Sequence, residues 1–276
     1  MSRKSILITG CSSGIGYDAA YAMRDAGWLV FASCRREEDC EHLRSEGFIS
    51  PRIDYADPES IVNGLSEVLE ATDGTLDALF NNGAFATPGA VEDLPRGALQ
   101  EIFETNVFGV HELTTLALQI MRAQGHGRIV NCSSVLGFVA APWRGAYVAS
   151  KFALEGLTDT LRIEMSDTDI KVILIAPGPI GTSFRQNSIP QFERWVDWEN
   201  SARAEQYRNS LLKRLYEDAG PTKFELPPSS VSRVLLRALN ARNPRARYRV
   251  TAVTRAMAVL RRLLPTRAMD AILSRG

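Results

Sequence analysis

The chain has 276 residues, of which 45% are hydrophobic and 23% charged, the composition of a soluble globular protein with room for one α/β domain. Lys plus Arg and Asp plus Glu number 32 each, so no overall positive field favours nucleic acid, and we expect no nucleic-acid partner. No run reaches the ~18 apolar residues of a membrane span, and the first apolar run is too short for a secretory signal.

The numbers and spacing of the cysteines and histidines indicate which covalent and metal-binding features to expect. The four cysteines include no Cys-x-x-Cys pair, and the three histidines lack the spacing of a helical metal site. We therefore expect a cytoplasmic protein without a disulfide framework and without a metal centre.

Short apolar runs rich in β-branched residues alternate with longer amphipathic segments along the chain. Strands are predicted at 5–9, 28–33, 47–53, 76–81, 127–133, 170–176 and 246–251. Helices are predicted at 14–26, 37–46, 57–71, 97–123, 147–166 and 229–240. Strands separated by helices indicate right-handed crossovers and a parallel sheet covered on both faces. We predict a single α/β domain with a doubly wound parallel sheet, the Rossmann fold, and a ligand at the carboxyl ends of its strands.

The loop TGCSSGIG, residues 9–16, joins the first strand to the first helix and contains Gly10, Gly14 and Gly16. Glycine allows a tight turn and lets a pyrophosphate approach the backbone, and the helix N-terminus offers free N–H groups. An ordinary βα turn can carry the same glycines. The position of the loop, at the first helix of a βαβ series, favours a dinucleotide site.

The end of the second strand discriminates between cofactors. A site for NAD usually has an acidic residue there, to bind the ribose 2′-hydroxyl. This chain has Ser33 and Cys34 at that point, followed by Arg35 and Arg36. The arginines could simply begin a solvated helix and pair with the glutamates that follow. Because the acidic residue is missing, we predict that they bind the 2′-phosphate of NADP(H), in preference to NAD(H).

Tyr147 and Lys151 lie four residues apart at the start of a predicted helix and so share one face of it. Ser134 ends the preceding strand, and this strand end meets the helix start at the carboxyl edge of the sheet. A nearby ammonium lowers the pKa of a phenol, so Lys151 would let Tyr147 exchange a proton with a substrate oxygen that Ser134 orients. Taken alone, Tyr147 and Lys151 would be interpreted as packing residues and Ser134 as a helix cap. The glycine-rich loop at 9–16 makes catalytic roles the favoured interpretation.

Residues 5–182 resemble the short-chain dehydrogenases/reductases. The resemblance rests on T-G-x₃-G-I-G at 9–16, an Asn-Asn element at 81–82, an Asn in the fourth helix, a Ser, and Y-x₃-K, all in family order. It implies catalytic roles for Asn106, Ser134, Tyr147 and Lys151. In the family, the Asn holds a water that links the Lys to a proton relay.

The same resemblance implies a set of cofactor contacts along the edge of the sheet. Asp54 would contact the adenine, although it could equally cap a helix, and the residues after the sixth strand would contact the carboxamide and phosphates. The predicted set comprises Gly10, Ser12, Ser13, Gly14, Ile15, Gly16, Arg35, Arg36, Asp54, Asn82, Gly83, Tyr147, Lys151, Pro177, Gly178, Ile180 and Thr182.

One element departs from the family pattern. The family usually reads N-N-A-G, whereas this chain reads Asn81-Asn82-Gly83-Ala84. Both exchanged residues are small, so the cofactor should still pass close to the backbone. A positive φ at position 84 would suit Ala poorly, and we expect a modest local change there.

Within the family, residues 9–16 and 147–165 are similar to the 17-beta-hydroxysteroid and retinol dehydrogenase branch. The segment 184–228 is interpreted as a substrate-binding insertion, whose scattered aromatic residues either line an apolar pocket or pack normally. The resemblance implies an NADP(H)-dependent oxidoreductase that interconverts a lipophilic alcohol and a ketone or aldehyde. A non-catalytic NADP(H) sensor or scaffold is the alternative. An epimerase or dehydratase would need a sugar-nucleotide site, for which the chain leaves little room.

The sequence divides into a catalytic domain at 1–253 and a basic amphipathic tail at 254–276. Apolar residues recur in the tail at helical spacing, Pro265 interrupts them, and arginines flank them. The tail could rest on an anionic membrane, but docking against the domain or a partner subunit is favoured. The resemblance also implies a homodimer or homotetramer.

Overall fold

The computed structural model describes residues 3–217, 220 and 224–274. Within them, six strands form one sheet in the order β2-β1-β3-β4-β5-β6, and every neighbouring pair is parallel. The strands are β1 (Ser5–Ile8), β2 (Leu29–Ala32), β3 (Ala78–Asn81), β4 (Gly127–Cys132), β5 (Ile170–Ala176) and β6 (Arg247–Arg249). This order confirms the predicted doubly wound sheet.

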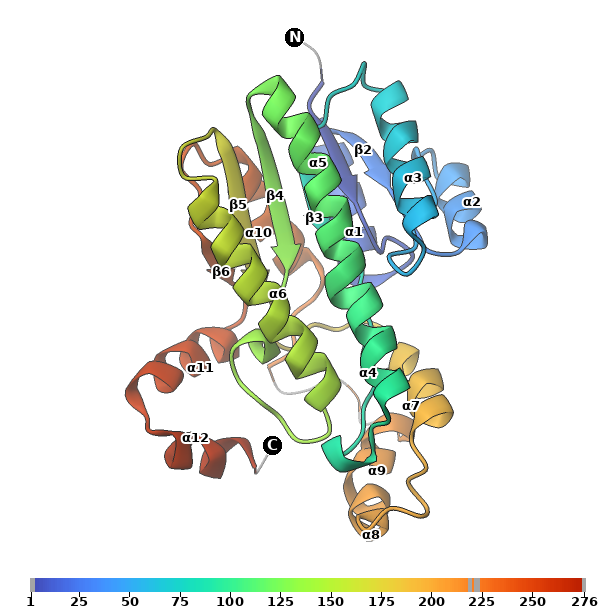
Figure 1. The fold of residues 1–276 in the computed structure, drawn as a ribbon, viewed down its shortest axis with the longest axis vertical. Helices are drawn as coiled ribbons and strands as arrows, with labels where there is room; N and C mark the ends of the chain where they lie inside the picture. The colour runs from blue at the N-terminus through green and yellow to red at the C-terminus, as the bar shows by residue number, and fades with distance from the viewer. Residues whose placement is uncertain (1–2, 218–219, 221–223, 275–276) are drawn as a thin grey trace.

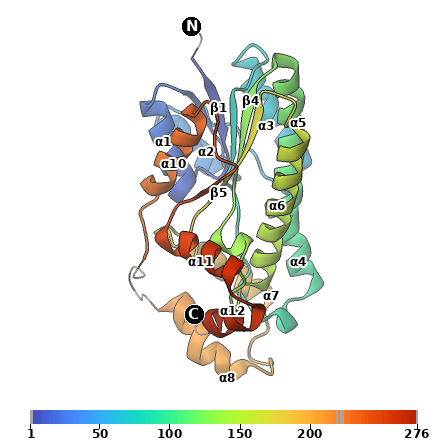
Figure 2. The same ribbon diagram turned by 90° about the vertical axis from the view of Figure 1, so that its left-hand side faces the viewer.

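Helices cover both faces of the sheet, as the edge-on view in Figure 2 shows. The helices on one face are α1 (Gly14–Asp25), α2 (Glu37–Ser45) and α10 (Ser229–Asn240). Those on the other are α3 (Pro58–Glu70), α5 (Val110–Gln124) and α6 (Gly145–Glu164). The strands alternate between the two resulting cores: in β1, Ile6 and Ile8 belong to the first core and Leu7 to the second.

The long helix predicted at 97–123 is interrupted. It consists of α4 (Arg96–Phe103), the π-helix η2 (Glu104–Gly109) and α5, which follow one another without a loop. Gly109 lies at the end of the π segment, where a Cβ would come within 2.1 Å of the Tyr55 carbonyl oxygen. The chain therefore needs glycine here so that the helix can approach the segment after residue 53.

The strand predicted at 47–53 is wrong. This segment makes only two isolated bridges, Phe31 with Ile49 and Cys34 with Arg52. Pro51 has no N–H to donate, and a residue of this kind in the middle of a short segment prevents a continuous ladder. The edge of the sheet therefore ends at β2 among the described residues.

A small helical lobe lies beyond the carboxyl ends of the strands (Figure 1). It comprises α7 (Ile189–Trp195), α8 (Ala204–Gln206), the π-helix η5 (Tyr207–Leu211) and α9 (Leu212–Tyr216). Phe192 and Tyr207 are 1% and 0% exposed in the core of this lobe, so they pack within it and do not line a pocket. The short helices η1 (Val91–Asp93), η3 (Val135–Gly137) and η4 (Gln186–Ser188) complete the chain around the lobe.

The tail forms two helices, α11 (Ala252–Leu263) and α12 (Thr266–Leu273). Thr251 caps α11, because its hydroxyl accepts a hydrogen bond from the Thr254 N–H at 3.1 Å. Ala258 and Met269 are buried, so each helix packs one side against the rest of the chain. No helix in the described part of the chain is both long and apolar enough to span a membrane.

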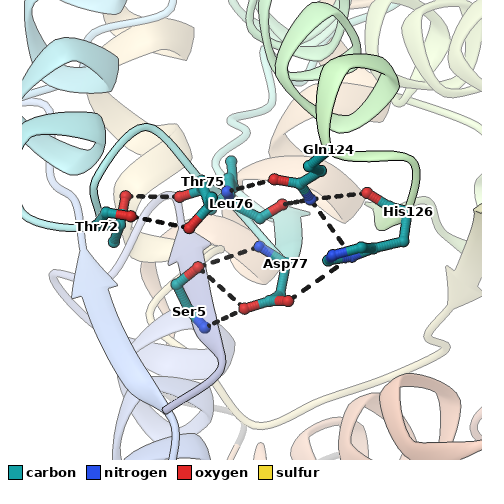
Figure 3. A network of polar contacts seen from close by, with 7 residues as sticks. All are labelled: Ser5, Thr72, Thr75, Leu76, Asp77, Gln124 and His126. Atoms are coloured by element: carbon teal, nitrogen blue, oxygen red, sulfur yellow. Dashed lines mark hydrogen bonds and ion pairs between the residues drawn. The ribbon is translucent and has the colours of Figure 1, made fainter. Parts of the chain in front are cut away.

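The amino edge of the sheet, opposite the lobe, is tied together by side chains (Figure 3). The Asp77 carboxylate accepts the Ser5 N–H at 2.8 Å, and the Ser5 hydroxyl accepts the Asp77 N–H at 3.1 Å. The Gln124 amide accepts from the Leu76 N–H and donates to the Leu76 carbonyl. His126 lies 3.8 Å from the Asp77 carboxylate. These contacts fix where β1 and β3 start relative to each other and hold the end of α5 beside them.

Tyr207→Phe is expected to lower the free energy of unfolding by about 1–3 kcal/mol. The Tyr207 hydroxyl accepts from the buried Ala90 N–H at 2.8 Å and donates to the Asp93 carboxylate at 2.7 Å. Its removal leaves the Ala90 N–H without this partner, whereas Asp93 keeps the hydrogen bond from the Ser201 hydroxyl. Urea unfolding followed by tryptophan fluorescence measures the loss. Tyr216→Phe is the control, because that hydroxyl meets Glu193 at the surface; an equal loss in both variants would contradict the prediction.

Candidate active site

The loop after β1 forms a cradle of backbone. Gly10 and Gly14 have φ of 69° and 59°, which favours glycine at both positions. A Cβ on Gly16 would lie 2.2 Å from the Gly10 carbonyl oxygen, and a Cβ on Gly10 would lie 2.7 Å from the Gly83 Cα. The first turn of α1 has no acidic residue, and the Ser13 side chain does not cap it. Free N–H groups at a positive helix end thus face a space that suits a diphosphate.

The segment after β5 closes over this cradle. A Cβ on Gly14 would meet the Thr182 methyl group at 2.9 Å, so Thr182 lies directly against the loop. A Cβ on Gly178 would meet the Thr251 hydroxyl at 2.2 Å, and the Pro177 carbonyl accepts the Val135 N–H at 2.7 Å. Ile15 and Ile180 are partly buried and pack against the core beneath the loop. Thr182 therefore lies beside the glycine loop, whereas Gly178 faces Thr251, and the cofactor contacts of residues 177–182 stay a prediction.

Asn82 joins the ends of β1 and β3. Its side-chain amide donates to the Thr9 carbonyl at 3.0 Å and to the Gly10 carbonyl at 3.2 Å. The Thr9 hydroxyl in turn accepts the Asn82 and Gly83 N–H groups. Asp73 and Trp143 are the non-glycine residues with positive φ in the described chain, so Ala84 is not strained. The positive φ that would suit Ala poorly is therefore absent at position 84, and the expected local change there stays a prediction.

The two arginines after β2 differ in their contacts. Arg36 forms a bidentate contact with Asp39 at 2.9 and 3.0 Å and lies 3.8 Å from Glu38. The Arg35 guanidinium is exposed and has no hydrogen bond or ion pair with any described residue. Arg35 is thus free to meet an anion, whereas Arg36 is largely engaged by its own helix.

The other residues predicted near the adenosine lie on the same edge. Ser12 and Ser13 are exposed in the glycine loop. Asp54 is partly buried, and its carboxylate accepts the Ala56 N–H at 3.0 Å in a tight turn. Asp57 caps α3 by accepting the Ser60 N–H, which leaves Asp54 outside the helix.

Tyr147, Lys151 and Ser134 meet at the carboxyl end of β4. The first turn of α6 buries Tyr147, and one turn later Lys151 is only 3% exposed. The Lys151 Nζ donates to the Cys132 carbonyl at 2.7 Å and lies 5.6 Å from the centre of the Tyr147 ring. Ser134 caps η3 by accepting the Leu136 N–H at 3.1 Å. The three predicted side chains therefore converge.

Burial is the largest cause of the pKa shifts of Tyr147 and Lys151. It raises the pKa of Tyr147, and the Ser134 hydrogen bond and the Arg144 charge offset only part of that rise. Burial also lowers the pKa of Lys151. The expectation that Lys151 would bring the Tyr147 pKa below its ordinary value is not met in this structure, because desolvation outweighs the favourable charges.

Asn106 holds the wall of the site. It is fully buried in the π-helix, a distortion common at functional sites. Its amide accepts the Phe85 N–H at 3.1 Å and donates to the Phe85 carbonyl at 2.9 Å and to the Ser150 hydroxyl at 3.1 Å. The Ser150 hydroxyl donates to the Tyr147 carbonyl at 2.9 Å. Asn106 thus connects the loop after β3 to the turn of α6 that carries Tyr147 and Lys151.

A buried polar chain under the site was missed by the sequence reasoning. The Tyr55 hydroxyl lies 2.8 Å from the Thr9 hydroxyl and donates to the side-chain amide oxygen (Oδ1) of Asn81 at 2.7 Å. The Asn81 amide donates to Asn131 at 2.8 Å, and the Asn131 amide donates to Thr158 at 2.9 Å. The sequence does carry a signal for this chain, because polar residues stand at positions 9, 81 and 131, at or near the ends of otherwise apolar strands.

Apolar groups surround the phenol of Tyr147. The Phe184 ring meets it edge-on, with centroids 5.3 Å apart. Ala86, Ile102 and Ala146 form a buried cluster with it, and partly buried apolar side chains, among them Phe85 and Leu136, pack around that cluster. No group of three or more His, Cys, Asp or Glu in the described ranges could hold a metal ion. The site combines a proton-carrying phenol, a buried ammonium and a nearby diphosphate cradle.

Comparison with known proteins identifies the family. Residues 4–192 match the family model for the short chain dehydrogenases, and the chain belongs to that family. Its fold is the nicotinamide-cofactor-binding fold of the family, and the protein is an oxidoreductase that acts on a small molecule.

Relatives match nearly the whole chain. An uncharacterized oxidoreductase of Escherichia coli, YbbO, is 41% identical over 271 residues, which cover 98% of this chain and 94% of the relative. A short-chain dehydrogenase from Streptomyces avermitilis has a TM-score of 0.77 and 27% identity, covering 99% of this chain and 94% of that one. A Burkholderia phymatum member solved in complex with NAD has a TM-score of 0.78 and 24% identity, over 99% and 95% of the two chains, and shows the same fold.

Proposed function

We propose that the protein is an NADP(H)-dependent oxidoreductase that interconverts a lipophilic alcohol with a ketone or aldehyde, with Tyr147 as general acid and base. The observation that carries this proposal is the convergence of Tyr147, Ser134 and Lys151 at the strand ends beside the glycine cradle. The cofactor contacts proposed above would place its reactive ring at this edge.

The proton chemistry follows from burial. A tyrosine is protonated at neutral pH, the form that carbonyl reduction requires, and burial favours this form further by raising the pKa of Tyr147. Tyr147 donates this proton to the carbonyl oxygen, Ser134 orients that oxygen by a hydrogen bond, and the Lys151 ammonium stabilises the charge that develops. Asn106 positions the turn that carries both residues. The bound nicotinamide supplies the hydride.

The surroundings of Tyr147 support a lipophilic substrate. Phe184 contacts the phenol directly, and Phe85 and Leu136 pack around the same cluster. Phe184 opens the segment 184–228, to which we assign substrate binding. A pocket lined by such side chains favours an apolar chain or ring next to the carbonyl.

A sensor or scaffold without turnover is the alternative. It needs the diphosphate cradle but places no demand on Tyr147, Ser134 and Lys151. Burying Lys151 costs free energy, and its single hydrogen bond to a carbonyl offsets only part of that cost. The presence of this costly arrangement beside the phenol supports catalysis.

Tyr147→Phe is expected to lower kcat for carbonyl reduction by about 10²- to 10⁴-fold, because the ring stays and only the proton donor is lost. NADPH oxidation with a panel of apolar ketones and aldehydes measures the effect. NADPH binding, followed by calorimetry, should persist. Tyr216→Phe is the matched surface control, and wild-type turnover by Tyr147→Phe would refute the mechanism.

The end of β2 supports NADP(H) as the cofactor. No carboxylate follows β2 at positions 33 and 34, and the Arg35 guanidinium is free among the described residues. A guanidinium can bind a phosphate through two parallel hydrogen bonds. We assign the 2′-phosphate mainly to Arg35, with Ser12 and Ser13 beside it.

Arg35→Gln is expected to raise the Kd for NADPH about 10-fold or more, because a charged hydrogen-bonded contact is lost, and to leave the Kd for NADH unchanged. Calorimetry with both nucleotides measures this. Arg36→Gln should have a smaller effect, since Asp39 already engages that side chain. Tighter binding of NADH than of NADPH by the wild-type protein would refute the assignment.

Exposed apolar side chains support assembly into a homodimer or homotetramer. Phe108 in η2 is 53% exposed, and Phe152 and Leu157 on α6 are also exposed.

The tail has a second exposed apolar surface, formed by Val259 and Leu263 one turn apart on α11. Arg255 and Arg262 lie at helical spacing beside them. Because Val259 and Leu263 stay exposed and do not dock against the domain, we propose that this surface contacts anionic lipid peripherally.

Val259→Glu combined with Leu263→Glu is expected to abolish co-sedimentation with vesicles that contain phosphatidylserine, because both positions are exposed and would carry repelling charges. Vesicles of phosphatidylcholine alone are the control and should bind neither protein. Equal sedimentation of wild type and variant would overturn the membrane contact and leave docking against protein as the role of the tail.

A further inference from the structure

Three arginines stand near the candidate active site without a carboxylate partner. Arg144 directly precedes α6, Arg185 directly precedes η4, and Arg214 lies in α9. None takes part in an ion pair or side-chain hydrogen bond between described residues. Two acidic residues of the same region are already engaged, Glu92 by Arg203 and Glu101 by Arg194.

Packing brings two of the three segments together. Trp143 and Leu215, the neighbours of Arg144 and Arg214, belong to the same hydrophobic cluster of the lobe. Trp143 lies 4.7 Å from Tyr207 within that cluster, measured between ring centroids. The lobe core therefore fixes two of the arginine-bearing segments against each other.

Two of these arginines, Arg144 and Arg185, lie close in the chain to the Tyr147 site. Arg144 precedes Tyr147 by three residues at the start of α6. Arg185 follows Phe184, whose ring contacts the phenol at 5.3 Å. Thr182 faces the glycine loop, so the chain passes from the cofactor cradle to the phenol within two residues. Arg185 is thus the residue that follows a direct contact of the phenol.

The charges are close enough to affect one another. Burial, followed by the charges of Arg214 and Arg185, lowers the pKa of Arg144 to about 10. Burial and the charge of Arg185 also lower the pKa of Arg214. Like charges in a partly desolvated region cost free energy unless an anion joins them.

The backbone before Arg144 is strained. Trp143 has φ of 65°, in the region that favours glycine, and its carbonyl accepts the Gly89 N–H at 3.1 Å. Strain of this kind persists only where the surroundings enforce it, and it concentrates at ligand-binding sites. The strained residue lies directly before Arg144.

We propose that Arg144, Arg185 and Arg214 form an anion-binding subsite where α6 meets the lobe, and that the substrate is a carbonyl compound bearing a carboxylate at the far end of an apolar chain. Guanidinium groups bind carboxylates through paired, charge-assisted hydrogen bonds. A carboxylate carries a single negative charge and therefore costs less to desolvate than a doubly charged anion. This suits a region where the apolar Phe184 and the lobe core are close. This inference rests on the proposed oxidoreductase function and specifies its substrate class.

The test compares ω-oxononanoate with its methyl ester, an uncharged aldehyde of the same chain length. With NADPH, wild type is expected to have kcat/KM at least about tenfold higher for the carboxylate. The Arg185→Gln/Arg214→Gln double variant should bring the two values close together. Arg208→Gln is the control, because this exposed arginine lies over Trp198, 5.4 Å from the ring centre. An equal preference in wild type and the double variant, or no preference in wild type, would overturn the subsite.

Calorimetry with nonanoate distinguishes failure of the subsite from failure of the proposed function. If neither aldehyde is reduced with NADPH or NADH, the oxidoreductase activity on this class fails. Nonanoate binding that weakens at least about tenfold in the double variant, but not in Arg208→Gln, would still support the subsite. Equal binding by all three proteins, or no binding, would overturn it. The NADPH Kd should be unchanged in the double variant, and a rise would assign the arginines to the cofactor.

Discussion

The buried hydrogen-bonded chain from Thr9 to Thr158 is the constraint on which the site depends. It crosses β1, β3 and β4 and ends on α6, and each of its groups is cut off from water. A slip of one residue between these strands would leave amides and hydroxyls unpaired in the core, at a cost of about 1–3 kcal/mol for each group. The strand ends are therefore level, and the glycine loop, Asn82 and Ser134 meet at one edge.

Desolvation then decides how this edge can react. A phenol placed where water is excluded keeps its proton, and an ammonium placed there must use the one carbonyl within reach. The sequence shows which residues are present and how they are spaced. It does not show how deeply each is buried, which is why the direction of the Tyr147 pKa could not be predicted from Lys151 alone.

Local patterns predicted most of the fold and the residues of the candidate site. The apolar strands, the glycines at 10, 14 and 16 and the Tyr147–Lys151 spacing act over a few residues, and their positions are confirmed. The strand at 47–53 was wrong because Pro51 breaks a ladder that its neighbours favour. Phe192 and Tyr207 could not be separated from pocket residues, because their burial depends on a lobe core assembled from distant segments. The arginines at 144, 185 and 214 were missed for the same reason.

The π-helix η2 connects the lobe to the candidate active site through the continuous segment from α4 to α5. Gly97 in α4 lies against Trp195 of the lobe, where a Cβ would come within 2.6 Å of the indole, and the Trp195 N–H donates to Glu101 at 2.8 Å. The same rod continues without a loop into η2, where Asn106 braces the turn of α6 that carries Tyr147. A π segment has a looser bonding pattern than the α-helices on either side and is the place where such a rod bends most readily. The lobe and the turn that carries Tyr147 are therefore joined through one continuous helical segment, of which η2 is the most easily bent part.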